Sequence, residues 1–398
     1  MTFADRYFLP SAFALAPSFL LLLTWPDEAT HTSQIVKNHA APVIAVEITV
    51  IAAALLAGWR PRFPLWPAIG LLALAAIALV TAYYAPLQQI SLIWTAYWVI
   101  HFLFGTAAAS MFCPKATIRA LLIGFVIFLL LLTVRSLMGP VHDWERNPPA
   151  FDQVRRFGYY GAAVAGIGIG YLALSRRPIL AFVAVCGAMA LMFWTGARGA
   201  VIATLVGPVA AAVVFPVLRK PRIVVCTFAA GAAGLAVASI LPSPVISMGA
   251  DRIVTLNEFS STGRIELWQS VVAAIAAKPW FGWGEAQTLA TGSILAQPHN
   301  LFLQVLLAWG AVGFLLVAYL GAVAARSAIS NVGDANLLLP FAVGALTLLA
   351  YSMIDGPLFH VQATSIFALC VGLAVGGNGR ENSMTATSNP SSPVSAAT

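Results

Sequence analysis

Residues 117–137 read TIRALLIGFVIFLLLLTVRSL, and this stretch decides the class of fold. A helix needs about 20 apolar residues to cross the hydrocarbon core of a bilayer, and this stretch has that length. Further apolar runs of similar length are separated by charges, prolines and polar clusters. The sequence therefore predicts an all-α polytopic membrane protein with about twelve transmembrane helices. The predicted spans are 7–25, 40–58, 64–84, 89–112, 117–137, 157–175, 178–195, 199–217, 223–241, 299–325, 336–354 and 360–377.

The composition excludes a soluble globular enzyme. Of the 398 residues, 60% are hydrophobic and only 9% are charged, whereas a soluble domain has about a quarter charged residues. The formal net charge is +7, but the basic residues lie singly and in pairs between apolar runs, as the flanking charges of membrane helices do. We therefore expect membrane lipids as partners and no nucleic acid. The four cysteines form neither a CxxC motif nor a cluster with histidines, so neither a disulfide framework nor zinc is indicated.

The distribution of charges predicts the orientation in the membrane. If the N-terminus is cytoplasmic, the inner segments hold twelve of the 21 basic residues and only Asp5, Asp334 and Glu381 among the 14 acidic ones. Every short inner loop then obeys the positive-inside rule. The sequence therefore predicts an inner-membrane protein with both termini in the cytoplasm. Residues 378–398 are rich in Ser, Thr, Pro, Asn and Ala, and we expect a disordered cytoplasmic tail.

Two outer segments, about 138–156 and 242–298, are too long to be simple connectors. For the second segment, 242–298, the sequence predicts a periplasmic helical loop. Ser261 or Thr262 can cap a helix, which stops at Lys278-Pro279 and is followed by an aromatic turn suited to the membrane–water interface. The apolar residues that recur at helical spacing in this loop are Ile265, Trp268, Val271, Val272 and Ile275.

Basic residues of the outer face could bind an anion. Arg198 lies in the tight turn TGARGA, and His299 lies in QPHN, where Pro298 is placed to open the next helix. Both would then be at outward-facing helix N-termini, whose free N–H groups and dipole favour negative charge. Arg264 would start the surface helix, and Arg156, after Arg155, would precede the helix from Phe157. Together these residues predict an outer site for a phosphate or diphosphate.

Each of these residues also has a plainer interpretation. Arg198 could snorkel at the interface, Arg155 and Arg156 could bind lipid headgroups, and His299 could cap a helix. Asp355 and His360, in the last outer turn, could support the site or cap a helix. Glu47 and His101, within the spans, are either functional, paired with an outer arginine, or part of a hydrogen bond from helix to helix.

No ligand cluster for a metal ion is evident. Asp251 and Glu258 are isolated in the long outer loop, and Glu266 and Glu285 are expected to be surface charges or salt-bridge partners. We therefore expect no metal and no cofactor.

Three motifs resemble the signature of the O-antigen ligase/polymerase superfamily. They are WTGARGA (194–200), STGR (261–264) with Trp268 and PWFGWG (279–284), and PHN (298–300) with Gln304. The likeness covers about residues 155–325, in order. The segment Arg156-Phe157-Gly158 is similar to a weaker element of the family, which usually continues with Asn-Pro rather than with Tyr159-Tyr160 as here.

The resemblance implies a GT-C-type, metal-independent glycosyltransferase formed by residues 1–377, with its active site facing the periplasm. Its donor would be a glycan on undecaprenyl diphosphate. Its acceptor would lie in the outer leaflet, and in an O-antigen ligase this acceptor is a sugar hydroxyl of lipid A–core. The matching positions make Arg198 and Arg264, together with Arg156, the diphosphate ligands. They make His299 the general base or the group that orients the acceptor.

Two alternatives stay open. An O-antigen or exopolysaccharide polymerase would share these motifs and use a second lipid-linked glycan as acceptor. A secondary transporter, a different class of protein, would be expected to have related halves. The sequence has no convincing internal repeat, so the transporter is the weaker hypothesis.

Overall fold

The computed structural model describes residues 3–24, 40–61, 63–138, 144, 148–151, 153–175, 178–241, 264–288, 297–332 and 336–376. Within these ranges the regular secondary structure is helical, without a β-strand. The predicted cap at Ser261 or Thr262, the isolated Asp251 and Glu258, and the tail 378–398 lie outside the described residues.

A helix occupies each position at which a span was predicted, because each apolar run can bury its backbone polar groups only in a helix. In the part of the chain that the structure describes, six helices are long and apolar enough to cross a membrane: α4 (Leu65–Tyr83), α5 (Gln88–Met111), α6 (Pro114–Met138), α7 (Arg155–Leu174), α10 (Pro221–Ile240) and α13 (Leu301–Asn331). Six further apolar helices are α1 (Phe3–Leu23), α3 (Ala41–Leu56), α8 (Ile179–Trp194), α9 (Arg198–Val214), α14 (Leu339–Ser352) and α15 (Val361–Gly376). The chain is thus a multi-pass membrane protein.

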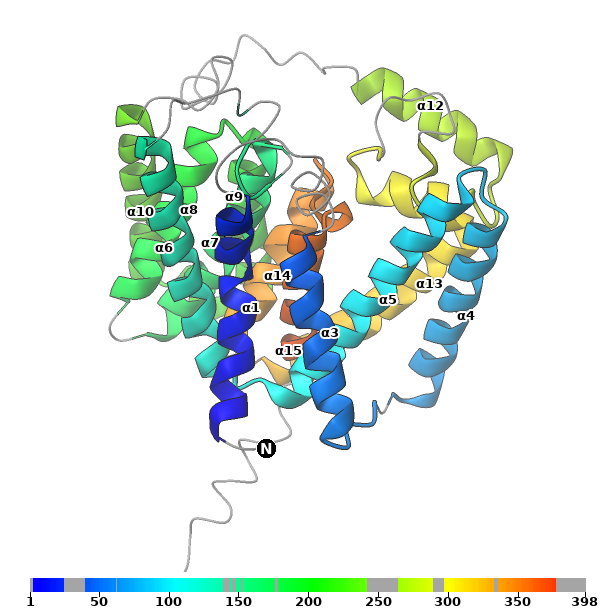
Figure 1. The fold of residues 1–398 in the computed structure, drawn as a ribbon, viewed down its shortest axis with the longest axis horizontal. Coiled ribbons are helices and arrows are strands. Elements are labelled where there is room, and N and C mark those ends of the chain that lie inside the picture. Colours follow the sequence, from blue (N-terminus) through cyan, green and yellow to red (C-terminus); the bar gives the residue numbers. More distant parts are fainter. Residues whose placement is uncertain are drawn as a thin grey trace, which may run out of the picture.

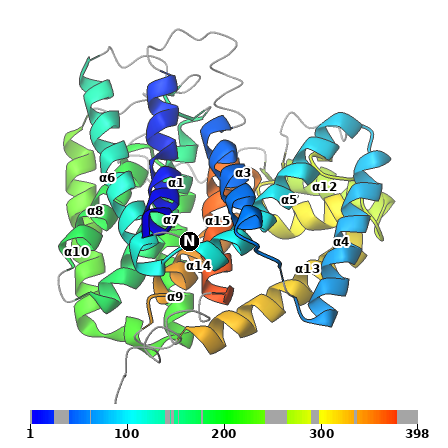
Figure 2. The same ribbon diagram turned by 60° about the horizontal axis from the view of Figure 1, so that its bottom comes forward.

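The bundle has two sides joined by central helices (Figure 1). Helices α6, α8 and α10 stand on one side, and α4, α5 and α13 stand on the other, in both views (Figures 1 and 2). Between them, α7 packs against α8 and α14, α14 packs against α9, and α15 packs against α5. The helix predicted in the long outer segment is confirmed as α12 (Arg264–Ala277), which lies against α13. Its place on the outer surface of the membrane stays a prediction.

Glycines allow the central helices to touch. A Cβ placed on Gly166 of α7 would lie 3.0 Å from the Cα of Gly344 on α14. One placed on Gly207 of α9 would lie 2.4 Å from the Cα of Thr347 on α14. Such close approach of backbones is how small residues hold membrane helices together. The glycines of the stretch 166–170 on α7 thus serve close helix packing.

The two ionisable residues within the predicted spans pair with each other. The Nδ1 atom of His101, on α5, lies 2.9 Å from both carboxylate oxygens of Glu47, on α3. Both side chains are buried, and Ser365 Oγ of α15 is 3.4 Å from the same Nδ1 atom. Of the three interpretations of these residues, the hydrogen bond from helix to helix is confirmed.

The aromatic turn after α12 is inserted into a break in α13. Gly310 has a φ of 62°, a left-handed conformation inside a helix. The peptide groups opened by this break bond to the turn, because Ala311 N donates to Pro279 O at 2.8 Å and Trp283 N donates to Leu307 O at 2.8 Å. These bonds fix α12, and with it Arg264, relative to α13.

Candidate active site

His299 lies in a strained turn immediately before α13. The helix begins at Leu301, and Asn300 is its N-cap, with a side-chain oxygen that accepts from Leu303 N at 3.1 Å. Asn300 Nδ2 donates to Met353 O, at the end of α14, at 3.1 Å. The prediction that Pro298 opens the helix is wrong, because the backbone of His299 takes a φ of 54° before the cap.

The carboxylate of Asp355, in the turn after α14, is the centre of the site. Its Oδ1 atom lies 2.5 Å from Nδ1 of His299, and it accepts from Tyr159 Oη at 3.3 Å and from the backbone N–H of Gly356 at 2.8 Å. Burial raises the pKa of Asp355, but the hydrogen bond and charge of His299, the charge of Arg264 and the Gly356 N–H outweigh it, so the net pKa is lowered. The group is therefore ionised, and His299 Nδ1 carries the proton that it accepts.

Arg264 approaches the same carboxylate from the other side. It is the first residue of α12, and its Nη2 atom lies 4.0 Å from Asp355 Oδ2. Its Nη1 atom donates to Ile354 O at 3.1 Å, which uses one of the five N–H donors of a guanidinium. Trp268, one turn further along α12, donates from Nε1 to Pro298 O at 2.8 Å. Arg264 and His299 are thus held together by Asp355 and by the side chain of Trp268.

Arg198 is the first residue of α9, as predicted. The residue after it, Gly199, is so close to α14 that a Cβ placed there would lie 2.9 Å from a ring carbon of Tyr351 and 3.8 Å from Ile354 Cγ2. Since Ile354 also accepts the bond from Arg264, the start of α9 reaches the same turn as the start of α12.

Arg155 and Arg156 lie in the first turn of α7, whereas the sequence predicted that the helix starts at Phe157. Burial, followed by the positive charges of Arg156 and His299, lowers the pKa of His360 well below its ordinary value. The positive charge of Arg156 therefore lies close enough to influence His360. The structure brings the four predicted residues, Arg156, Arg198, Arg264 and His299, to the elements that surround the turn 353–360.

Asp355 is the residue whose part sequence reasoning left undecided. The available signal was a single acidic residue in a short, predicted outer turn between apolar helices. This signal could not identify His299 as the hydrogen-bond partner of Asp355, because the two residues are 56 positions apart. Of the two interpretations of Glu285, the surface charge is wrong, because the side chain is buried. Gln304 Nε2 donates to its Oε2 atom at 2.9 Å. Glu266 is exposed, as predicted.

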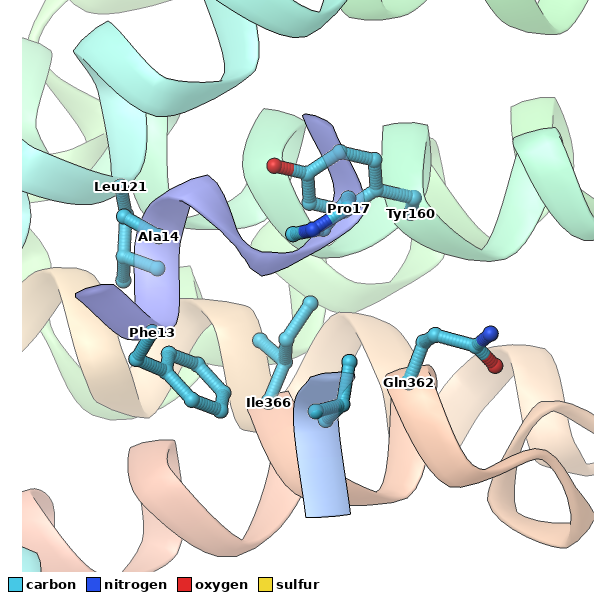
Figure 3. A pocket seen from close by; sticks show the side chains of 8 residues that line it. Phe13, Ala14, Pro17, Leu121, Tyr160, Gln362 and Ile366 are labelled. Atoms are coloured by element: carbon cyan, nitrogen blue, oxygen red, sulfur yellow. The ribbon is translucent and has the colours of Figure 1, made fainter. Parts of the chain in front are cut away.

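A separate hollow lies between α1, α3, α6, α7 and α15 (Figure 3). Its volume is about 10 Å³, which fits one water molecule and no sugar. The lining is mostly apolar, and Tyr160 and Gln362 supply its polar groups. This hollow contributes nothing to the cluster around Asp355.

The cluster combines a polarised histidine with fixed positive charge. With Nδ1 of His299 donating to Asp355, the other ring nitrogen of a neutral imidazole is an acceptor and can take a proton. Guanidinium groups near it can stabilise an anionic leaving group. Among the described residues, no three His, Cys, Asp or Glu side chains gather as a metal site, and metal independence stays a prediction.

Two comparisons with known proteins give relatives of the chain. Residues 182–318 match the sequence profile of the O-antigen ligase family. A curated O-antigen ligase from Pseudomonas aeruginosa is 29% identical over 192 residues, which is 44% of this chain. The alignment spans 43% of that relative's length. The matched profile includes Arg198, Arg264 and His299 and ends before Asp355.

Proposed function

We propose that this member of the O-antigen ligase superfamily transfers a glycan from undecaprenyl diphosphate to an acceptor in the outer leaflet, with lipid A–core as the acceptor. The chain would cross the bacterial inner membrane twelve times, in a GT-C-type architecture, with both termini in the cytoplasm and the Asp355 cluster facing the periplasm. The observation that carries the proposal is the hydrogen bond between His299 Nδ1 and Asp355 Oδ1, beside Arg264.

In the proposed reaction, His299 is the general base. The oxygen of the acceptor hydroxyl attacks the anomeric carbon of the donor sugar and forms the new glycosidic bond. The bond from that carbon to the diphosphate oxygen breaks, and the diphosphate leaves with the electron pair. The hydroxyl proton passes to Nε2 of His299. Asp355 is a positioning residue, because it fixes the tautomer and stabilises the imidazolium that forms.

Three arginines are proposed to bind the diphosphate. Arg198 and Arg264 begin helices whose N-termini also favour anions, and Arg156 lies in the first turn of α7. An arginine stays charged and can bind two oxygens at once. These groups would stabilise the charge of the leaving diphosphate more than that of the bound donor, which lowers the barrier without a metal ion.

Deletion of the gene, followed by gel analysis of lipopolysaccharide, tests the function. Loss of all O-antigen on lipid A–core, with accumulation of lipid-linked polymer, is the expected result. Core bearing single repeat units would instead identify a polymerase. An intact final linkage would identify a transporter.

Transfer by the purified protein should persist in excess chelator. Loss of transfer in chelator, followed by recovery when a divalent ion is added, would contradict metal independence.

The roles of His299 and Arg198 are separable in purified variants. His299→Ala should lower the transfer rate by roughly 10²–10⁴-fold and leave donor binding intact, because its proton belongs to the acceptor. Arg198→Ala should raise the barrier by about 2–4 kcal/mol and weaken donor binding, and Arg198→Lys should restore it only in part. Loss of donor binding in a folded His299→Ala protein would make His299 a phosphate ligand instead.

A further inference from the structure

The left-handed backbone of His299 requires a support. A positive φ is uncommon for any residue but glycine and persists where the surroundings hold it. Two supports are already described, the bond from Trp268 to Pro298 O and the bond from Asn300 to Met353 O. The first holds Pro298 through its carbonyl oxygen, and the second holds Asn300 through its side chain. A third support is formed by the side chains of Gln297 and His360.

Gln297 supplies this third support, two residues before His299. Its side chain lies directly on Gly356, where a Cβ would be 2.6 Å from Gln297 Oε1. Only glycine at position 356 leaves room for this amide. Gly356 is also the residue whose N–H donates to Asp355. The amide of Gln297 therefore fills the space beside the peptide group that orients the Asp355 carboxylate.

His360 anchors the far end of that amide. Its Nε2 atom lies 3.0 Å from Nε2 of Gln297, and both side chains are about nine-tenths buried. An amide nitrogen can only donate, so Nε2 of His360 accepts and the ring proton is on Nδ1. The ring stacks on Tyr159 with centroids 5.0 Å apart and planes inclined by 23°. Tyr159 in turn donates to Asp355 at 3.3 Å.

These contacts form a closed circuit that includes the proposed base, His299, and is completed by the backbone from Gln297 to His299. From His299, one path runs through Asp355 and Tyr159 to His360, and the other runs along the backbone to Gln297 and across its amide to His360. We propose that Gln297 and His360 form a clamp of positioning residues, which holds the His299 turn so that its Nε2 atom faces the acceptor hydroxyl. This inference rests on the proposed function.

The clamp predicts a split between catalysis and binding. Gln297→Leu and His360→Leu should each lower kcat for glycan transfer at least about 10-fold, because a misplaced base is used less often. Donor Kd should change less than about threefold, since neither side chain belongs to the arginine group. The double variant should lose no more than the worse single variant, because residues of one unit are not additive. His360→Gln, which keeps an acceptor near the position of Nε2, should recover most of the rate.

The matched control is Gln362→Leu, which removes a buried amide two residues further along, in the separate hollow. It should leave kcat unchanged. Wild-type kcat in both clamp variants, additive losses, or a fall in donor binding as large as the fall in kcat would each overturn the clamp.

A second measurement works without transfer activity. The side chain of His299 is 18% exposed, and the rate of its carbethoxylation by diethyl pyrocarbonate can be followed by mass spectrometry. This rate should rise at least about threefold in Gln297→Leu and stay unchanged in Gln362→Leu. An unchanged rate in Gln297→Leu would overturn the clamp. A wild-type protein that transfers no glycan, yet has the expected labelling pattern, would overturn the proposed function and leave the clamp standing.

Discussion

The Asp355 side chain connects three parts of the chain that are far apart in sequence. It accepts from Tyr159 of α7 and from His299 before α13, and it faces Arg264 of α12. Removing one partner of a buried, hydrogen-bonded charge leaves the others without compensation. The carboxylate therefore holds the turn in shape and also fixes which ring nitrogen of His299 faces it.

Asp355→Asn should separate these two roles. The amide keeps the size of the side chain, but its NH₂ group can turn toward Nδ1 of His299 and favour the tautomer that carries its proton on Nε2. We expect the transfer rate to fall by about 10²-fold or more, while donor binding changes little. Single-turnover transfer and donor binding of the purified variant measure this. A transfer rate within twofold of wild type would show that Asp355 does not set the tautomer.

Glu285 gives a residue-level prediction on pH. Burial raises its pKa from 4.5 to about 7, against the lowering effect of the bonds from Gln304 and the Ala286 backbone. A raised carboxyl pKa means that the folded state holds the proton more tightly, so stability falls as the pH rises from 4.5 to 7 and stays lower above it. The midpoint of thermal unfolding in detergent should fall over this range by the equivalent of about 3 kcal/mol.

Glu285→Gln should remove that dependence and raise the midpoint at pH 8, since a neutral amide replaces a buried charge. The exposed Glu266 provides the control, and Glu266→Gln should keep the wild-type profile. A Glu285→Gln protein whose unfolding midpoint still falls between pH 5 and pH 8 as in wild type would assign the dependence to another group.

Among the helices, α13 depends on contacts far from its own sequence. Its break at Gly310 is filled by the turn after α12, and a Cβ placed on Gly310 would lie 2.3 Å from the carbonyl carbon of Trp280. An L-residue there would combine an unfavourable φ with a backbone clash. The α12 helix, which carries Arg264, is therefore attached to the membrane bundle at a position that only glycine satisfies.

Gly310→Ala should destabilise the protein by at least about 2 kcal/mol and lower the transfer rate. Gly321→Ala, in the same helix and with no atom within 4 Å of the added methyl group, is the control. It should be neutral or stabilising by up to about 1 kcal/mol. Thermal unfolding of both variants in detergent compares them. Equal midpoints for the two would mean that the turn does not depend on Gly310.

The sequence was sufficient to predict the helices but not the ways in which they are interrupted and joined. Helix positions follow from the length of apolar runs, which is a local property, and residues 117–137 lie within α6. The break at Gly310 arises from peptide groups of the turn at Pro279 and Trp280, about thirty positions earlier. The bond between His299 and Asp355 likewise depends on how α13 and α14 meet. Only the fold brings such partners together.

For the molecule as a whole, the arrangement in the membrane is a prediction with a direct test. Reporters fused after Arg219 and in the C-terminal tail should report the cytoplasm, and reporters at Asn257 and Asn147 should report the periplasm. Neither asparagine lies among the described residues, so the fusions test the charge rule independently of the fold. A cytoplasmic signal at Asn257 would put Arg264 in the wrong compartment and overturn the site.

The contacts of Gly166 and Gly207 with α14 restrict how a lipid-borne sugar could travel to the cluster. Backbone atoms of α7 and of α9 approach those of α14 closely at these glycines, so a prenyl chain has no room between the helices at these two contacts. Passage of a long-chain lipid between α7, α9 and α14 at these contacts would require the helices to separate and would disrupt their close packing. A donor of the proposed kind would therefore reach the arginines by a route that does not pass between these helices at the two glycine contacts.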